Sequence, residues 1–280
     1  MDEHFRAFSF VDRIDSVQPG VSIRGRYQIP PALTAFSASL VAEAVGQLAA
    51  WAAMAAVDFQ RRPVAGIAAE IDLLAPVRPG QVLELAAELE TVDDEAAAYG
   101  GTAHADGIAV IRLQHCVGPM LPVEEFDDPQ ALRARHALLQ AAGATPGAFR
   151  GLPNFPLQRT GGEAGQSLRA TFHVPDSAPF FGDHFPRRPV FPGTLLINAN
   201  LELAAELATA LPAPTAGKKW ALSRLSDVKL RAFTPPGASL EMEARLTALS
   251  DSAANLTVET RNDKRLISGA RVLLVPEEWS

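Results

Sequence analysis

The feature of this chain that most constrains its fold is an internal repeat. Three segments of the first half resemble three segments of the second half, at displacements of 155 or 157 residues. The matching pairs are residues 39–44 with 194–199, residues 48–50 with 203–205, and residues 79–84 with 236–241. Nearly equal displacements for separated segments are hard to obtain by chance, so we expect two copies of one fold. The alternative is two unrelated alanine-rich helices that match only in composition.

The two halves also share one order of expected elements. Each begins with a short strand, continues with a long helix rich in alanine and leucine, and ends with about three strands. First-half strands are expected at residues 8–14, 66–74, 81–91 and 95–117, the last turning at Asp106-Gly107. Second-half strands are expected at residues 167–174, 221–232, 239–249 and 253–275, the last turning at Asn262-Asp263.

One helix with a mostly antiparallel sheet predicts an α+β arrangement in each half. The helix near residues 40–57 is apolar on nearly all of its faces, so a sheet must wrap around it. We expect an N-terminal repeat at residues 1–118, a connector at 119–154 and a C-terminal repeat at 155–280. The two repeats would pair side by side as a pseudo-dimer.

The connector contains a helix signal of its own. Asp128 is a good N-cap, Pro129 fits the first turn, and Gly143 can end the helix. Such a helix would bridge the repeats and bury three leucines, Leu132, Leu138 and Leu139.

Charge and cysteine content exclude several functional classes. The formal net charge of −7 argues against general nucleic-acid binding, because nothing offsets the repulsion by phosphate. Cys116 is the only cysteine, so no intrachain disulfide can form. The first residues lack the pattern of a signal peptide, and polar residues interrupt the apolar stretch at residues 40–57. We therefore expect a cytoplasmic protein that does not bind a membrane.

Two segments with ionisable side chains complement each other across the repeat. Residues 184–193 form a proline-rich loop with one histidine, His184, that leads into an apolar helix. Fourteen residues after His184, where an acid would complete a site, the chain has Asn198. The matching helix of the first half has Glu43 at this place, but no histidine precedes it. One half thus offers a base and the other an acid, which predicts one composite site.

Both residues also have purely structural interpretations. His184 can be a loop histidine held by Asp183. Glu43 lies on an otherwise apolar helix and needs a partner in any case, which can be the backbone or Gln47.

The string His-Phe-Pro-x-x-Pro-Val-x-Pro-Gly at residues 184–193, followed by an apolar helix, resembles the FabZ/FabA family of 3-hydroxyacyl-acyl carrier protein dehydratases. That motif normally continues to an acid and then Ala-x-x-Gln, and residues 43–47 match this acid end in the other half. Residues 10–14 resemble the family's opening strand. The resemblance covers most of both halves and implies a double hot-dog fold, in which each repeat wraps an antiparallel sheet around a long central helix.

The resemblance also implies roles for the site residues. Family members dimerise, and each site takes its histidine from one subunit and its acid from the other. His184 would remove the C2 proton of a 3-hydroxyacyl thioester, and Glu43 would protonate the leaving C3 hydroxyl. The amide of Gly193, which can also be a simple helix-entry glycine, would donate to the thioester carbonyl. The second site, with Asn198 and the histidine-free loop at residues 29–31, would be inactive.

Further residues are assigned by the same resemblance. The tunnel or loop positions are Phe185, Pro186, Phe191 and Gln47. Arg187 stands where the family usually has glycine, and with Arg188 it would place positive charge near the tunnel mouth for an acidic carrier protein.

The expected substrate is an acyl thioester on the phosphopantetheine of an acyl carrier protein or on coenzyme A, in fatty-acid or polyketide-like biosynthesis. The chemistry requires no metal or other cofactor, and the pseudo-dimer can associate into a further homo-oligomer. Two other functions stay open: an acyl thioesterase on the same fold, and a non-catalytic module that binds acyl chains or a carrier protein. Hydratases that act on coenzyme A esters usually show Asp-x-x-x-x-His, which we do not find at a suitable helix entry.

Overall fold

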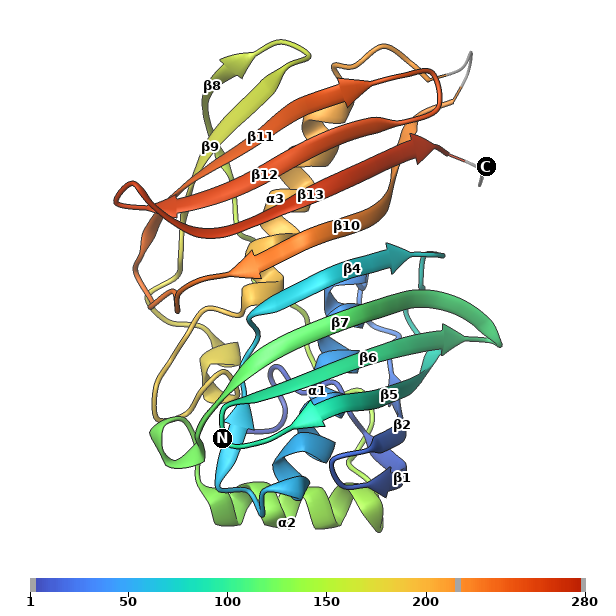
Figure 1. Cartoon of the computed structure of the whole chain (residues 1–280), viewed down its shortest axis with the longest axis vertical. Helices are drawn as coiled ribbons and strands as arrows, with labels where there is room; N and C mark the ends of the chain where they lie inside the picture. Colours follow the sequence, from blue (N-terminus) through green and yellow to red (C-terminus); the bar gives the residue numbers. More distant parts are fainter. Residues whose placement is uncertain (1–3, 215–217, 278–280) are drawn as a thin grey trace.

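The computed structural model describes residues 4–214 and 218–277, whose strands form one large antiparallel sheet (Figure 1). The first-half strands are β1 (Arg13–Gln18), β2 (Ser22–Gln28), β3 (Arg61–Pro63), β4 (Ile67–Leu73), β5 (Val82–Val92), β6 (Ala96–Ala105) and β7 (Ile108–Pro122). The second-half strands are β8 (Gln158–Glu163), β9 (Ser167–His173), β10 (Trp220–Leu230), β11 (Ser239–Leu249), β12 (Ala254–Asn262) and β13 (Arg265–Pro276). Two long helices, α1 (Ala38–Ala56) and α3 (Gly193–Ala208), lie behind the sheet in this view.

The strand order of one half mirrors that of the other. It runs β1-β2-β5-β6-β7-β4 and then β10-β13-β12-β11-β9-β8, while β3 pairs with the end of β7. The halves meet where β4 pairs with β10, with Ile71 opposite Leu225 and Ala68 opposite Val228. Within the described residues, all strand pairing between the halves therefore runs through this one seam.

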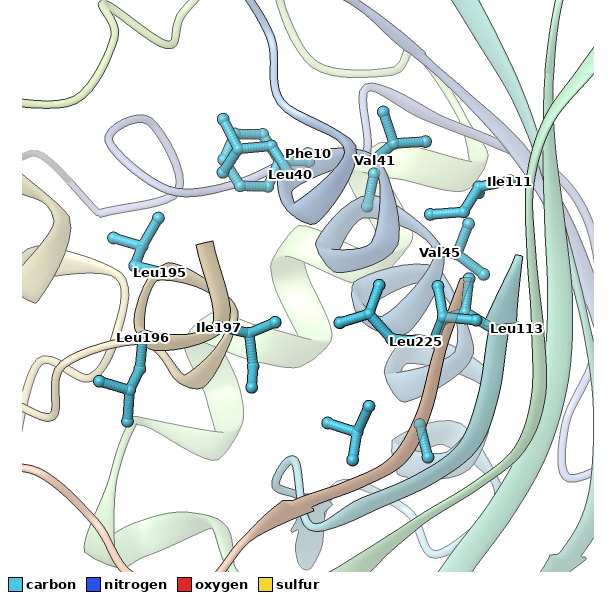
Figure 2. Packing of buried hydrophobic residues seen from close by; sticks show 14 of the residues in the cluster. Phe10, Leu40, Val41, Val45, Ile111, Leu113, Leu195, Leu196, Ile197 and Leu225 are labelled. Atoms are coloured by element: carbon cyan, nitrogen blue, oxygen red, sulfur yellow. The ribbon is translucent and has the colours of Figure 1, made fainter. Parts of the chain in front are cut away.

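The core lies between the helices and the concave face of the sheet. α1 packs against β2, β5, β6 and β7, α3 packs against β9 to β13, and the two helices contact each other. Figure 2 shows apolar side chains of both helices, such as Val45 and Ile197, directed into this core. The sheet approaches α1 so closely that a Cβ atom on Gly101 would lie 2.5 Å from Cγ1 of Val45, so this position of β6 requires glycine.

Most of the expected strands are confirmed. Strands β4 to β7 and β9 to β13 lie where the sequence predicts them, and the first hairpin turns at Asp106-Gly107, both with positive φ. The second hairpin turns one residue later than expected, at Asp263 and Lys264. The expected strand at residues 8–14 is largely wrong, because pairing begins only at Arg13, and strands β2, β3 and β8 were not predicted.

The connector helix is confirmed as α2 (Pro129–Gln140). The side chain of Asp128 accepts a hydrogen bond from the amide of Gln130 at 2.8 Å, and Gly143 has φ +79° just beyond the helix. Leu132 and Leu139 are buried, but Leu138 is 41% exposed, so that part of the prediction is wrong. α2 packs against β1.

Among the described residues, α1 alone is long and apolar enough to cross a membrane by length and composition. Most of its apolar window is buried inside the protein, as in the core helix of a globular protein.

An ion-pair cluster ties the two halves together at the β4–β10 seam. Arg224 of β10 donates from Nε to Asp72 at 2.7 Å and from Nη1 to Glu70 at 2.8 Å. The Asp72 side chain is only 9% exposed. Replacing Arg224 would therefore leave a mostly buried carboxylate without this charged partner, which destabilises the folded state.

We therefore expect Arg224→Met to lower the free energy of unfolding by about 2 kcal/mol, measured by urea denaturation. The control is Arg245→Met, since Arg245 pairs with Glu243 on its own strand and neither side chain is buried, with 57% and 32% exposed. That change should cost less than about 0.5 kcal/mol. Equal losses in the two variants would contradict a special role for the seam cluster.

Candidate active site

His184 lies in the loop between the short 3-10 helix η2 (Pro179–Gly182) and α3. Its amide donates to the carbonyl of Phe180 at 2.8 Å, and its own carbonyl accepts from the amide of Val190 at 2.9 Å. Its ring Nδ1 lies 2.9 Å from the carbonyl oxygen of Val190. The loop therefore holds both the backbone and the ring of this histidine.

These contacts define which ring nitrogen can act as a base. A carbonyl oxygen only accepts hydrogen bonds, so Nδ1 of His184 carries a proton and donates it to Val190. In the neutral ring Nε2 is then unprotonated. Burial lowers the pKa of His184 below its ordinary value of 6.5, and the nearby charge of Glu43 opposes this shift. His184 is therefore a neutral base at neutral pH.

Glu43 lies on α1 and is held from both halves of the chain. Its Oε1 accepts from Nε2 of Gln47 at 2.9 Å, one helical turn further on. Its Oε2 accepts from the hydroxyl of Thr194 at 2.7 Å, at the start of α3. The structural partner that the sequence suggests for Glu43, Gln47, is thus present, together with a partner from the C-terminal half.

His184 and Glu43 line the same cavity, which measures about 230 Å³. Its walls are largely apolar and come from both halves, including α1, the β4–β10 seam and the start of α3. Gly193 and Gln47 also line it. The chain thus brings the expected base and the expected acid to one apolar space.

Gly193 is the first residue of α3, and two features make it suitable as a hydrogen-bond donor. The residue before the helix, Pro192, provides no side-chain cap, and its carbonyl accepts from the amides of Leu195 and Leu196, so the Gly193 amide has no acceptor within the helix. A Cβ atom on Gly193 would lie 2.3 Å from Cδ1 of Leu230, so glycine leaves space around this amide that a larger residue would take only by displacing the Leu230 side chain.

Of the three other residues predicted for the tunnel or its loop, one lines the cavity and two do not. Phe185 lines the cavity and its ring lies 5.2 Å from that of Phe126, but Pro186 is exposed and does not line it. Phe191 is buried in the core against Phe172, outside the cavity.

The two arginines of the histidine loop and Asn198, the residue of the degenerate second site, all make contacts within the chain. Arg187 and Arg188 are exposed, and each lies near an acid of the connector, Asp128 at 3.8 Å and Glu125 at 3.1 Å. Asn198 does not line the cavity and donates to Glu202 at 2.8 Å.

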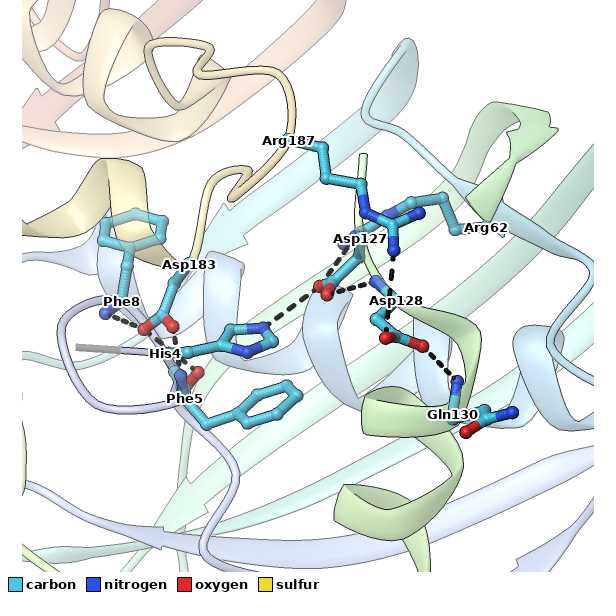
Figure 3. Close-up of polar contacts among 10 residues, drawn as sticks. His4, Phe5, Phe8, Arg62, Asp127, Asp128, Gln130, Asp183 and Arg187 are labelled. Atoms are coloured by element: carbon cyan, nitrogen blue, oxygen red, sulfur yellow. Dashed lines mark hydrogen bonds and ion pairs between the residues drawn. The ribbon is translucent and has the colours of Figure 1, made fainter. Parts of the chain in front are cut away.

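The sequence suggested Asp183 as a structural partner of His184 itself, but its observed contacts are with the N-terminal segment and position the histidine loop. Its carboxylate accepts from the amides of Phe5 and Phe8 and from the hydroxyl of Ser9, so the N-terminal segment is tied to the residue before His184 (Figure 3). Burial raises the pKa of Asp183, and the donating amides oppose this shift. No hydrogen bond joins its side chain to the His184 ring within the described contacts.

Two cavity residues, Thr194 and Arg62, were also not predicted. Thr194 follows Gly193 directly, but its contact with Glu43 joins two distant segments, and the repeat alignment does not indicate it. Arg62 lies in a Gln-Arg-Arg-Pro stretch that resembles an exposed basic turn, and nothing in the sequence signals its burial.

Comparison with known proteins now identifies the family. The ApeI-like family, described as ApeI dehydratase, matches residues 160–270, which include His184 and Gly193. The FabZ 3-hydroxyacyl-acyl carrier protein dehydratase of Anaeromyxobacter dehalogenans is 32% identical over 113 residues, covering 40% of this chain and 72% of that protein. The chain belongs to the FabZ/FabA-like family of hot-dog dehydratases. The FabZ/FabA-like match confirms the predicted family.

Solved structures support the hot-dog fold of this FabZ/FabA-like chain. A Lactobacillus plantarum protein described as a putative oleoyl thioesterase superposes with a TM-score of 0.59 at 11% identity, covering 93% of this chain and 98% of that one. A MaoC-like dehydratase superposes with a TM-score of 0.52 at 13% identity, covering 92% and 98%. Both show a shared fold and not a shared reaction.

Proposed function

We propose that this chain is a dehydratase that converts a 3-hydroxyacyl thioester to a trans-2-enoyl thioester. The observation that carries the proposal is that His184 and Glu43 line one apolar cavity from opposite halves of the chain. Its membership of the FabZ/FabA-like family agrees with this reaction.

The residues support a simple sequence of proton transfers. Nε2 of His184 takes the proton from C2, and the electron pair of the C2–H bond shifts toward the thioester oxygen. The amide of Gly193 donates a hydrogen bond to that oxygen as it gains negative charge. The C2=C3 double bond then forms as the C3–O bond breaks, and the hydroxyl leaves as water with a proton from the carboxylic acid form of Glu43. The proton that His184 has taken from C2 restores that acid for the next turnover.

The proposal includes a tandem arrangement with one working site. The mirrored strand order supports two hot-dog repeats, residues 1–118 and 155–280, joined by the connector at 119–154 as a pseudo-dimer. The second site, at Asn198 and the loop at residues 29–31, would be inactive because it has neither a histidine nor an acid in these places.

We further propose that the substrate is bound to an acyl carrier protein or coenzyme A, as part of fatty-acid or polyketide-like synthesis in the cytoplasm. The relatives act on carrier-bound or thioester substrates by their descriptions. Arg187 and Arg188 are exposed on the histidine loop and are the proposed contacts for an acidic carrier. Their ion pairs with Asp128 and Glu125 would have to open or be shared on docking.

A thioesterase is the second candidate, because a thioesterase description occurs among the proteins of similar fold. Such an enzyme would use the Glu43 carboxylate to activate water, and it would not need the base at His184.

One experiment separates these functions. Purified protein is given a short trans-2-enoyl thioester, and loss of the conjugated absorbance is followed together with release of free thiol. Loss of absorbance without thiol is the expected result and reports hydration, the reverse of the proposed reaction. Thiol release would support the thioesterase, and binding without either change would support a non-catalytic module.

The pH dependence of dehydration follows from the pKa of His184. The neutral ring is the active base, and burial lowers its pKa, so the base form persists to more acidic pH than for an ordinary histidine. In the dehydration direction we expect the acid limb of kcat/KM to fall below pH 6.5. An acid limb clearly above this value, in a profile of kcat/KM against pH, would contradict a buried neutral base.

A further inference from the structure

Arg62 is a buried cation in the proposed active site that the mechanism above does not use. It lies on β3, lines the same cavity as His184 and Glu43, and its side chain is only 14% exposed. Its Nε and Nη1 are buried and have no hydrogen-bond partner among the described residues. Native proteins rarely leave buried donors unpaired, so these two atoms call for an acceptor that the protein itself does not supply.

The surroundings of Arg62 fix its orientation and leave those donors available. Its guanidinium carbon lies 3.9 Å from the centre of the Phe185 ring, next to His184 in the loop. Stacking uses the face of the guanidinium, whereas its N–H groups point outward in its plane. Asp127 balances the charge with its Oδ2 at 3.7 Å from Nη1, too far for a hydrogen bond (Figure 3).

The charge of Arg62 acts on the reacting end of the cavity. Burial lowers the pKa of Arg62 to about 10, which still leaves it charged at neutral pH, and Asp127 and Glu43 oppose the shift. For His184, burial is the main cause of the lowered pKa, and Arg62 lowers it further. Arg62 thus lines the same cavity as both members of the proposed pair, and its charge is felt by His184.

We propose that Arg62 is a catalytic residue that donates a hydrogen bond from Nε or Nη1 to the thioester carbonyl oxygen of the substrate. This inference rests on the proposed dehydratase function. As the C2 proton moves to His184, the oxygen gains negative charge, and a fixed guanidinium in an apolar cavity stabilises that charge more than the ground state. A carbonyl oxygen has two lone pairs, so it can accept from Arg62 and from the amide of Gly193 together.

The test compares dehydration of a short 3-hydroxyacyl-coenzyme A by the wild-type protein and by three variants. We expect Arg62→Ala to lower kcat about 100-fold with a smaller change in KM, because the interaction strengthens in the transition state. Guanidinium chloride, well below denaturing concentrations, should restore part of this rate. Arg62→Lys keeps the charge, so it should leave the acid limb of the pH profile in place while failing to restore the full rate.

Arg61→Ala is the matched control, because Arg61 neighbours Arg62 but bonds to the carbonyl of Met120 and lies near Asp94, outside the cavity. It should dehydrate at the wild-type rate. An unchanged kcat in Arg62→Ala, or a loss that guanidinium does not restore, would overturn the role of Arg62 alone. An inactive wild-type protein would overturn the dehydratase function and this inference with it.

Discussion

Replacing His184 with alanine is expected to lower the rate of enoyl-thioester hydration about 1,000-fold, the middle of the range for losing a general acid–base group. Hydration is the reverse of dehydration, so the same ring must return its proton to C2. The reacting nitrogen is Nε2, because Nδ1 donates to the carbonyl of Val190, and alanine removes it. The rate is measured by loss of the conjugated absorbance of the substrate.

The matched control is His173→Ala, since His173 lies on β9 with a side chain 60% exposed and outside the cavity. It should hydrate at the wild-type rate. Thermal unfolding of both variants should stay near that of wild type, which separates lost chemistry from lost structure. A His184→Ala protein that folds and retains most of its hydration activity would contradict the assignment of His184 as the base.

Replacing Glu43 with glutamine is expected to lower the same rate about 100-fold, because the amide has nearly the same shape but cannot exchange a proton in the reaction. Its oxygen can still accept a hydrogen bond from Thr194, so the start of α3 should stay in place. The loss should therefore appear in kcat and not in the free energy of unfolding.

Glu202→Gln is the control, because Glu202 lies on α3 and bonds to Asn198, the residue that matches Glu43 in the other half. This variant should keep full activity if the second site is inactive. Combining His184→Ala with Glu43→Gln should cost little more than His184→Ala alone, because residues that act as a unit are not additive. Additive losses would mean that the two side chains serve separate sites.

Much of the fold follows from local sequence signals. The hairpin turns contain residues that tolerate positive φ, such as Asp106 and Gly107, and α2 has its N-cap at Asp128. The repeat places α1 and α3 correctly, because both are long apolar segments whose alignment needs no tertiary information.

The segment before β1 shows where such signals fail. Residues 8–12 have the composition of a strand, with Phe8 and Phe10 fully buried. Yet the side chain of Gln47 accepts from the amide of Phe10 at 2.8 Å and donates to the carbonyl of Phe8 at 2.9 Å. A side chain from α1 thus satisfies backbone groups that a neighbouring strand would satisfy, and no local pattern reveals this substitution.

The candidate site likewise contains residues that the sequence predicts and residues that it does not. His184, Glu43 and Gly193 were predictable, because the motif and the repeat place them by spacing alone. Arg62 was not, because its burial depends on contact between β3 and the loop that carries Phe185, far apart in the sequence. The sequence also suggested Phe191 for the tunnel, but its ring packs among other aromatic rings of the core.

The cavity has walls from both halves, and in the part of the chain that the structure describes, strand pairing between these halves is confined to the β4–β10 seam. An acyl chain that fills the cavity would therefore touch both halves at once and act as a non-covalent cross-link between them. Since a ligand that binds only the folded state adds its binding free energy to stability, substrate or product would tighten the association of the halves. The stability of the contact between the halves would then depend on whether the cavity is occupied. It would fall when product leaves and rise again when the next substrate binds.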